Sequence, residues 1–328
     1  MNKLAIIIVN FKGWQALDEC LSSLEAITSD KIVLEVIVVD NCSNDGNFDT
    51  FQKKFSKFKF ILNSGNNGFA NGCNVGAANA SSEYLLFLNP DTKVDKQNLE
   101  LFFQAYLNNE NEIAVLSCLQ IDENEKFYKQ HNLLPKFATF FGIPRAIYKL
   151  FFKNKISETF QENENFIYPE WVTGAVVLLS KKWFDKVSGW NEDFWMYMED
   201  VDLCKRISDA NGKIAVYKKA TIFHKHGGAS RINIKTKALT KTEVIISKHV
   251  YIQNNFSSIS GFFLHTRLIF GVLIEKLLFS IIALPLFFVK KLQVNKLILK
   301  NYISYLFSVL KNKTFLSPRA TKFAVSKS

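Results

Sequence analysis

Four apolar runs near the start of the chain constrain its fold more than any other feature. Stretches that can be helical, notably 14–27 and 71–80, separate the runs LAIIIVN (4–10), LEVIVVD (34–40), FKFILN (58–63) and YLLFLN (84–89). Such alternation predicts an α/β fold with a Rossmann-like, mostly parallel sheet flanked by helices. Each run ends in a polar residue: Asn10, Asp40, Asn63 or Asn89. We therefore expect a ligand site at the carboxyl edge of the sheet.

The turn after the first run excludes two common phosphate-binding loops. It reads VNFKGWQAL and holds one glycine. A dinucleotide-binding turn needs GxGxxG, and a P-loop needs GxxxxGK followed by Ser or Thr. The predicted edge must therefore bind phosphate groups by other means.

The net charge of +11 is confined to the last quarter of the 328-residue chain. Residues 1–247 hold 29 basic and 29 acidic groups, whereas residues 248–328 hold 12 basic groups and one acid, Glu275. We expect an α/β domain over 1–247 and a basic, apolar helical region over 248–328. Basic groups interleaved with apolar stretches favour an anionic membrane surface over a nucleic acid.

The segment 262–291 is the candidate membrane element. Its longest uncharged run, Leu277 to Val289, has 13 residues and contains Pro285. Because a spanning helix needs about 20 apolar residues, we expect the segment to lie in the interface. A buried helix packed on the first domain is the alternative.

Cysteine usage and the N-terminus indicate a reducing, cytosolic compartment. The five cysteines are odd in number and show no CxxC spacing, so neither a zinc ribbon nor a disulfide framework is indicated. The start of the chain, MNKLAIIIVNFKG, resembles a signal peptide only weakly, because it lacks a small-residue cleavage site. It is interpreted as the first buried strand.

Two aspartates follow predicted strands. Asp40, in VIVVDNCSND, can accept hydrogen bonds from a ribose or base, although aspartate also favours turns for local reasons. Asp91, in LNPDT, suits a hard cation that bridges phosphate oxygens, although NPD is also a common turn. In the stretch between them, NNGFANGCNVGA (66–77), tight helix packing explains Gly72 and Gly76 better than it explains Asn67 and Gly68.

The acids of EDVDLCKR (199–206) form the densest polar cluster. Glu199 and Asp200 are adjacent, so one can act at a reaction centre while the other positions it. Asp202 and Arg206 are spaced for a helical ion pair. In TIFHKHGGAS (221–230), His224 is either structural or a cation ligand, and Ser230 and Arg231 could meet a phosphate.

Taken in order, these motifs resemble a known family. Asp40, NGFAxGxN (67–74), LNPD (88–91), TGA (173–175), EDVDLCKR and HxxGG (224–228) are similar to the inverting family 2 glycosyltransferases of the GT-A fold. The resemblance covers residues 3 to about 232 and is closest to rhamnosyltransferase-like members that build bacterial surface polysaccharides such as O-antigen.

The resemblance implies roles for individual residues. Asp200 would be the general base, and Glu199 would orient the acceptor or the base. Asp91 and His224 would hold a divalent cation, Mg²⁺ or Mn²⁺; because Asn89 replaces the first acid of the usual D-x-D, dependence on the cation stays open. The nucleotide-sugar site would comprise Asn10, Phe11, Asp40, Asn41, Asn67, Gly68, Asn89 and Asp91. The acceptor or sugar would contact Thr173, Gly174, Ala175 and Trp195.

The expected activity is transfer of a sugar, rhamnose as the first choice, from a dTDP- or UDP-linked donor to a lipid-linked saccharide. The protein would lie at the cytoplasmic face of the cell membrane. The aromatic and basic insertion 122–168 would be either a surface helix pair or a lip on the acceptor side. A non-catalytic sugar-nucleotide-binding protein and a glycoside hydrolase are the alternatives, but a hydrolase needs two carboxyl groups facing each other roughly 5 to 9.5 Å apart.

Overall fold

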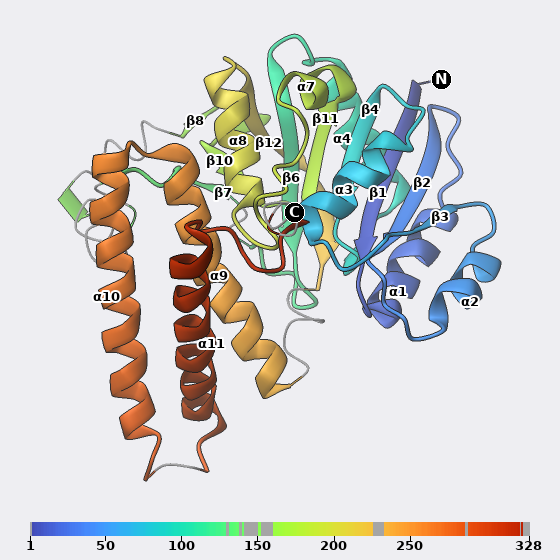
Figure 1. Ribbon diagram of the computed structural model, residues 1–328. Helices are drawn as coiled ribbons and strands as arrows, with labels where there is room; N and C mark the ends of the chain where they lie inside the picture. Colours follow the sequence, from blue (N-terminus) through green and yellow to red (C-terminus); the bar gives the residue numbers. More distant parts are fainter. Residues whose placement is uncertain are drawn as a thin grey trace. The chain divides into compact units, whose positions relative to one another are not determined.

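The chain forms two compact units in a computed structural model (Figure 1). The first comprises Met1–Asn191 and Glu199–His226, and the second comprises Glu192–Met198 and Gly227–Ser328. The structure describes residues 2–128, 131–137, 140, 150–151, 160–225, 233–285, 288–321 and 323. The units divide between 226 and 227 rather than at the expected 247/248, because one continuous helix, α9 (Ile234–Asn255), runs through the expected boundary.

A mixed sheet forms the centre of the first unit, with strand order β3-β2-β1-β4-β11-β6-β12-β9-β8 and β5 paired with β12. The strands are β1 (Asn2–Asn10), β2 (Ile32–Asp40), β3 (Lys59–Leu62), β4 (Tyr84–Leu88), β5 (Thr92–Lys93), β6 (Ile113–Ile121), β8 (Gln161–Glu162), β9 (Phe166–Tyr168), β11 (Val176–Ser180) and β12 (Lys213–His224). A separate pair joins β7 (His131–Asn132) to β10 (Trp171–Val172). The helices are α1 (Trp14–Glu25), α2 (Asn47–Lys54), α3 (Phe69–Ala78), α4 (Lys96–Leu107), α7 (Lys181–Lys186) and α8 (Glu199–Asp209).

The prediction of a mostly parallel sheet is wrong for half of it. β1, β2, β3 and β4 are parallel to their neighbours, and β6 is parallel to β12. β11 lies antiparallel between β4 and β6, and β12 pairs antiparallel with β5 and β9. The reason is chain order: β11 returns from the insertion to fill the position next to β4, and it enters from the opposite end.

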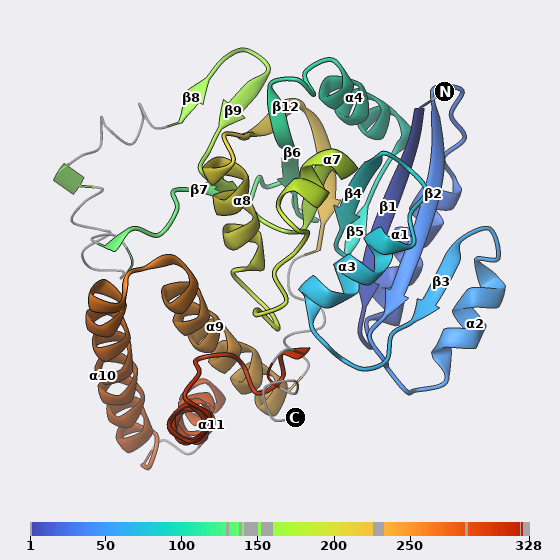
Figure 2. The same ribbon diagram turned by 45° about the horizontal axis from the view of Figure 1, so that its top comes forward.

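Helices cover both faces of this sheet (Figure 2). Leu4, Ile6 and Ile8 of β1 pack in one core with α1 and α4, whereas the alternate residues Ala5, Ile7 and Val9 pack in a second core with α3, α7 and α8. Burial of each large apolar side chain stabilises the fold by about 1.5 to 3 kcal/mol. The continuous apolar runs of the sequence therefore reflect strands that are buried on both faces.

The insertion 122–168 ends in a hairpin. Residues 161–168 form the β8–β9 hairpin, which pairs with β12 through β9. Leu150 and Phe151 are exposed. Residues 129–130, 138–139, 141–149 and 152–159, which include most of the expected helix pair or lip, lie outside the described residues.

The second unit packs α9 with α10 (Ser258–Ile282) and α11 (Lys290–Asn312). His249 of α9 joins all three helices, because its ring nitrogens contact His265 Nδ1 at 2.8 Å and the Tyr302 hydroxyl at 2.7 Å. Glu243 of α9 is fully buried and accepts hydrogen bonds from Arg319 at 2.8 Å and Ser317 at 3.0 Å. In the described part of the chain, no helix combines the length and the apolar character needed to cross a membrane.

Candidate active site

One edge of the sheet holds the carboxyl ends of β1, β2, β3, β4, β6 and β12, and it is the edge that the sequence predicts for a ligand. β2, β1 and β4 are mutually parallel, and β11 runs antiparallel to both β4 and β6. The carboxyl ends of β1, β2, β4, β6 and β12 therefore meet the amino end of β11. Asn10, Asp40, Asn89 and His224 lie at or just after these ends, and Gly174 lies just before β11.

Asp40 anchors the part of the edge formed by β1 and β2. Its Oδ1 accepts a hydrogen bond from Asn10 Nδ2 at 3.0 Å and one from the Ser43 hydroxyl at 2.5 Å, and its Oδ2 accepts one from the Ser43 amide at 2.8 Å. Asp40 is 1% exposed and Asn10 is fully buried. A carboxylate has about four acceptor positions, and three of them are used by these protein donors.

The loop after β3 closes the same region. Asn41 Nδ2 donates to the Gly68 carbonyl at 2.9 Å, and Asn63 Nδ2 donates to Asn41 Oδ1 at 2.9 Å. Gly68 has φ +94°, a conformation that other residues rarely adopt. Asn67 Nδ2 contacts the Ser64 hydroxyl at 3.2 Å. Asn41 and Gly68 are therefore joined directly, whereas Asn67 is tied to the loop itself.

The glycines of α3 have the packing role that the sequence favours. A Cβ at Gly76 would lie 2.4 Å from Ile7 Cγ2, and a Cβ at Gly72 would lie 2.6 Å from Val9 Cγ1. The close approach of α3 to β1 requires glycine at both positions. Phe11, just after β1, is 40% exposed and presents an apolar ring at the edge.

Asp91 and His224 meet as a pair. His224 Nε2 lies 3.1 Å from Asp91 Oδ1, and the amide of Lys225 donates to the Asp91 carbonyl at 2.8 Å. His224 Nδ1 lies 2.8 Å from Gln120 Oε1 on β6. When Nδ1 donates its proton to Gln120, Nε2 presents a lone pair toward Asp91, which is the tautomer that binds a cation.

The residues present at this pair fit a divalent cation with two protein ligands. Within the described ranges, no group of three His, Cys, Asp or Glu side chains gathers as a metal site. A cation held by Asp91 and His224 would therefore complete its coordination with phosphate oxygens and water. The imidazole donor suits Mn²⁺ better than Mg²⁺.

Asp200 lies in the first turn of α8 and is fixed by two backbone amides. Its Oδ2 accepts from Gly174 at 3.0 Å, and its Oδ1 accepts from Val201 at 2.8 Å. Burial raises the pKa of Asp200, and the two amides oppose this shift because they stabilise the charged form. The carboxylate is oriented and is more basic than an exposed aspartate.

Glu199 directly precedes Asp200, and its side chain is buried. Burial, together with the charge of Asp200, raises the pKa of Glu199 well above its ordinary value. Its Oε2 is buried and has no hydrogen-bond partner among the residues described. Tyr197 and Met198, just before the pair, have positive φ values of 75° and 64°. Such strain is a feature of functional sites.

Backbone pairing between β4 and β11 links the segment that carries Asp91 to the segment that holds Asp200. Leu88 pairs with Val176, and the amide of Asn89 donates to the Ala175 carbonyl at 3.0 Å. Gly174, which holds Asp200, directly precedes Ala175. The structure therefore places Asp91 and Asp200 at one end of the β4–β11 pair.

Three further predicted residues have definite positions. Asp202 forms the predicted ion pair, with Arg206 Nε 2.6 Å from Asp202 Oδ2. The hydroxyl of Thr173 is buried without a partner in the described part of the chain. Trp195 belongs to the second unit, where it is buried and Arg319 lies over its ring at 5.6 Å. Gly227, Gly228, Ser230 and Arg231 lie outside the described residues.

Sequence reasoning missed two supporting residues. Gln120 lies one residue before the end of β6, is fully buried, and contacts His224. The signal was available, because a polar residue near the end of the apolar run IAVLSCLQI follows the pattern of the other strands. Ser43, which supplies two of the three donors to Asp40, carries only the ordinary signature of a turn.

Comparisons with known proteins agree with this arrangement. Residues 5–187 match the family model for glycosyl transferase family 2, and residues 157–227 match that for the N-terminal domain of galactosyltransferase. The low-salt glycan biosynthesis hexosyltransferase Agl10 of Haloferax volcanii is 22% identical over 68% of this chain and 67% of its own. The N-acetylglucosaminyl-diphospho-decaprenol L-rhamnosyltransferase of Mycobacterium tuberculosis is 23% identical over 67% of this chain and 75% of its own.

The same fold occurs in a solved structure. The crystal structure of GalNAc-T7 with UDP, GalNAc and Mn²⁺ has a TM-score of 0.55 and 13% sequence identity, and it covers 77% of this chain. This chain spans 50% of that protein. The likeness shows a shared fold.

Proposed function

The chain belongs to glycosyl transferase family 2, and from this we propose that it transfers a sugar, with inversion, from a nucleoside diphosphate to a lipid-linked saccharide. The observation that carries the proposal is the position of Asp200. It is a basic, fixed carboxylate at the sheet edge that also holds Asp91 and His224. The family prediction made from the sequence is confirmed.

In the proposed reaction, Asp200 removes the proton from an acceptor hydroxyl. The hydroxyl oxygen attacks the anomeric carbon on the face opposite the diphosphate, and the bond between that carbon and the diphosphate oxygen breaks. Burial raises the pKa of Glu199, which favours its neutral form, so it would add little negative charge beside the base. In that neutral form the Glu199 carboxyl could also donate a hydrogen bond.

The donor would lie across the rest of the edge. Asp40, held by Asn10, would contact the nucleoside, and the exposed ring of Phe11 can stack on the base. Asp91 and His224 would hold the divalent cation, Mn²⁺ in preference to Mg²⁺, and when bound it would neutralise charge on the diphosphate. The hydrogen bond from the Asn89 amide to the Ala175 carbonyl holds the end of β4, which precedes Asp91, in place.

We propose rhamnose, carried on dTDP, as the first donor to test, with UDP-linked hexoses next. Two relatives support this choice by name, the mycobacterial rhamnosyltransferase and the rhamnosyltransferase WbbL of Escherichia coli, which is 26% identical over 45% of this chain. The mycobacterial name also supports a lipid diphosphate acceptor. A lipid-linked acceptor would place the reaction at the cytoplasmic face of a membrane.

The test measures nucleoside diphosphate released by the purified chain from a panel of sugar nucleotides, with and without an N-acetylglucosaminyl-diphospho-polyprenol acceptor. We expect release that requires the acceptor and a product of inverted anomeric configuration. Release from none of the donors, or cleavage of a finished glycan, contradicts the proposal. Activity that survives a chelator contradicts the cation assignment alone.

A further inference from the structure

α10 exposes a continuous apolar stripe. Its members, which are 53% to 75% exposed, are Ile259, Phe263, Phe270, Ile274, Leu277 and Ile281. At 3.6 residues per turn these positions fall within about 60° around the helix, and they extend along about 33 Å of its length. The opposite side of α10 carries the buried residues Gly261, Leu264, Leu268 and Val272. The stripe therefore faces away from the packed side.

α11 exposes a second stripe that is basic as well as apolar. Lys296, Lys300, Ile303, Phe307 and Leu310 fall within about 80° around this helix. Phe307 and Leu310 are 68% and 76% exposed. Neither lysine has a carboxylate partner in the described ranges. α11 contains no acidic residue, and the one acid of α10, Glu275, pairs with Lys276.

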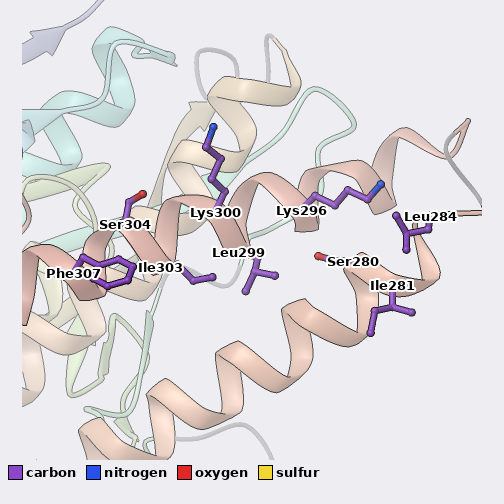
Figure 3. Close-up of a pocket in the computed structure, with 9 residues that line it drawn as sticks. All are labelled: Ser280, Ile281, Leu284, Lys296, Leu299, Lys300, Ile303, Ser304 and Phe307. Atoms are coloured by element: carbon purple, nitrogen blue, oxygen red, sulfur yellow. The ribbon is translucent and has the colours of Figure 1, made fainter.

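The two stripes meet in a groove of about 540 Å³ (Figure 3). Ile281 and Leu284 line it from α10 and the turn that follows, and Leu299, Ile303 and Phe307 line it from α11. Figure 3 shows Leu299 and Ile303 pointing toward α10, while Lys296 and Lys300 extend from α11 at its margin. The groove therefore joins the C-terminal end of the α10 stripe, at Ile281, to the α11 stripe with its two lysines.

We propose that this α10–α11 face lies on an anionic lipid bilayer, with the α10 stripe in the acyl boundary and Lys296 and Lys300 against lipid phosphates. Apolar residues on one face with lysines beside them are typical of helices that lie in a membrane interface. Large exposed apolar patches mark interaction sites on otherwise soluble units.

Charge decides between a bilayer and a second copy of the chain. In a two-fold symmetric dimer the same surface patch meets itself. Lys296 and Lys300 would then be brought toward other basic side chains with no acid of α10 or α11 free to pair with them, and like charges across an interface are unfavourable. An anionic bilayer supplies both the apolar phase and the opposite charge.

This inference rests on the membrane location proposed above, and its test needs neither donor nor acceptor, so failed docking and failed sugar transfer are separate results. The full chain is floated with vesicles of phosphatidylcholine alone or of phosphatidylcholine mixed with phosphatidylglycerol. We expect tighter binding to the mixture, weakened by salt because the charge attraction is screened.

Two double substitutions test the apolar part and the basic part of this surface separately. Phe263→Glu with Phe270→Glu should lower binding to both vesicles at least about ten-fold, because charges replace two exposed rings that the bilayer would bury. Lys296→Gln with Lys300→Gln should lower binding to the anionic vesicles roughly 30-fold and leave binding to the neutral ones unchanged. Leu101→Glu, at an exposed leucine of α4, is the matched control and should bind like the unmodified chain.

The lysine pair keeps the test decisive if the phenylalanine pair fails to fold. Binding to neither vesicle, or unchanged binding by folded phenylalanine and lysine variants, overturns the proposal. So does a dimer, measured by light scattering, that the phenylalanine pair converts to a monomer.

Discussion

Replacing Asp40 with asparagine should destabilise the first unit, because the carboxylate accepts three donors that an amide cannot all satisfy. Ser43 donates to Asp40 through both its amide and its hydroxyl, and Asn10 supplies the third hydrogen bond. In Asp40→Asn one oxygen becomes an NH₂ group. If this group takes the Oδ2 position, it faces the fixed amide proton of Ser43.

The other orientation also leaves a conflict. At the Oδ1 position the new NH₂ group faces the NH₂ group of Asn10, whose own oxygen already accepts from the Gly13 amide at 3.1 Å. A buried donor without an acceptor costs about 1 to 3 kcal/mol. We therefore expect Asp40→Asn to lower the free energy of unfolding by about 2 kcal/mol, which corresponds to a fall in Tm of about 4 to 8 °C for a unit of this size.

Differential scanning calorimetry measures this shift. The matched control is Asp49→Asn, since Asp49 is an exposed acid in the first turn of α2 and its loss should cost only about 0.3 to 1 kcal/mol. If Asp40→Asn melts no lower than Asp49→Asn, the three hydrogen bonds do not hold this edge together and the reasoning is refuted.

Two further predictions concern stability. Burial lowers the pKa of His249 well below its usual range and that of His265 to about 4, so both rings are neutral in the folded chain. The second unit should therefore keep its full stability above about pH 6.5 and lose it progressively as the pH falls toward about 4. A Tm that does not change across this range would contradict the buried pair. Gly76→Ala should lower the free energy of unfolding by about 1 to 3 kcal/mol, because the added Cβ would meet Ile7. Gly271→Ala, at a position of α10 with open space around it, should raise the free energy of unfolding by up to about 1 kcal/mol. Equal effects of the two substitutions in chemical denaturation would show that α3 does not approach β1 closely.

The sequence predicts what depends on local pattern. The β1, β2, β3 and β4 strands are found within two residues of their expected bounds, because each is an apolar run bounded by polar or turn residues. The Asp202–Arg206 ion pair is confirmed because its spacing of four residues is set by the helix itself.

Long-range partners could not be predicted in this way. His224 meets Gln120 across 104 residues, and the pairing depends on β6 and β12 being neighbours. The antiparallel insertion of β11 beside β4 decides that Gly174 reaches Asp200. Strand order is a property of the packed sheet, and a single sequence with no local signal for it leaves such contacts open.

The assignment of Asp200 as the base is tested most directly by kinetics of Asp200→Asn. Asparagine keeps the size of the side chain but cannot accept the acceptor's proton. Asp209→Asn is the matched control, because Asp209 is exposed on the same helix and pairs with Lys205.

The decisive measurement is kcat for acceptor-dependent release of nucleoside diphosphate, with donor binding followed separately by thermal shift. Asp200→Asn should lower kcat about 100-fold or more while donor binding is retained, and Asp209→Asn should change it little. In the unmodified chain, activity should fall as the pH drops below the raised pKa of Asp200, because only the carboxylate accepts the proton. A folded Asp200→Asn chain that binds donor and turns over as fast as Asp209→Asn would contradict the account.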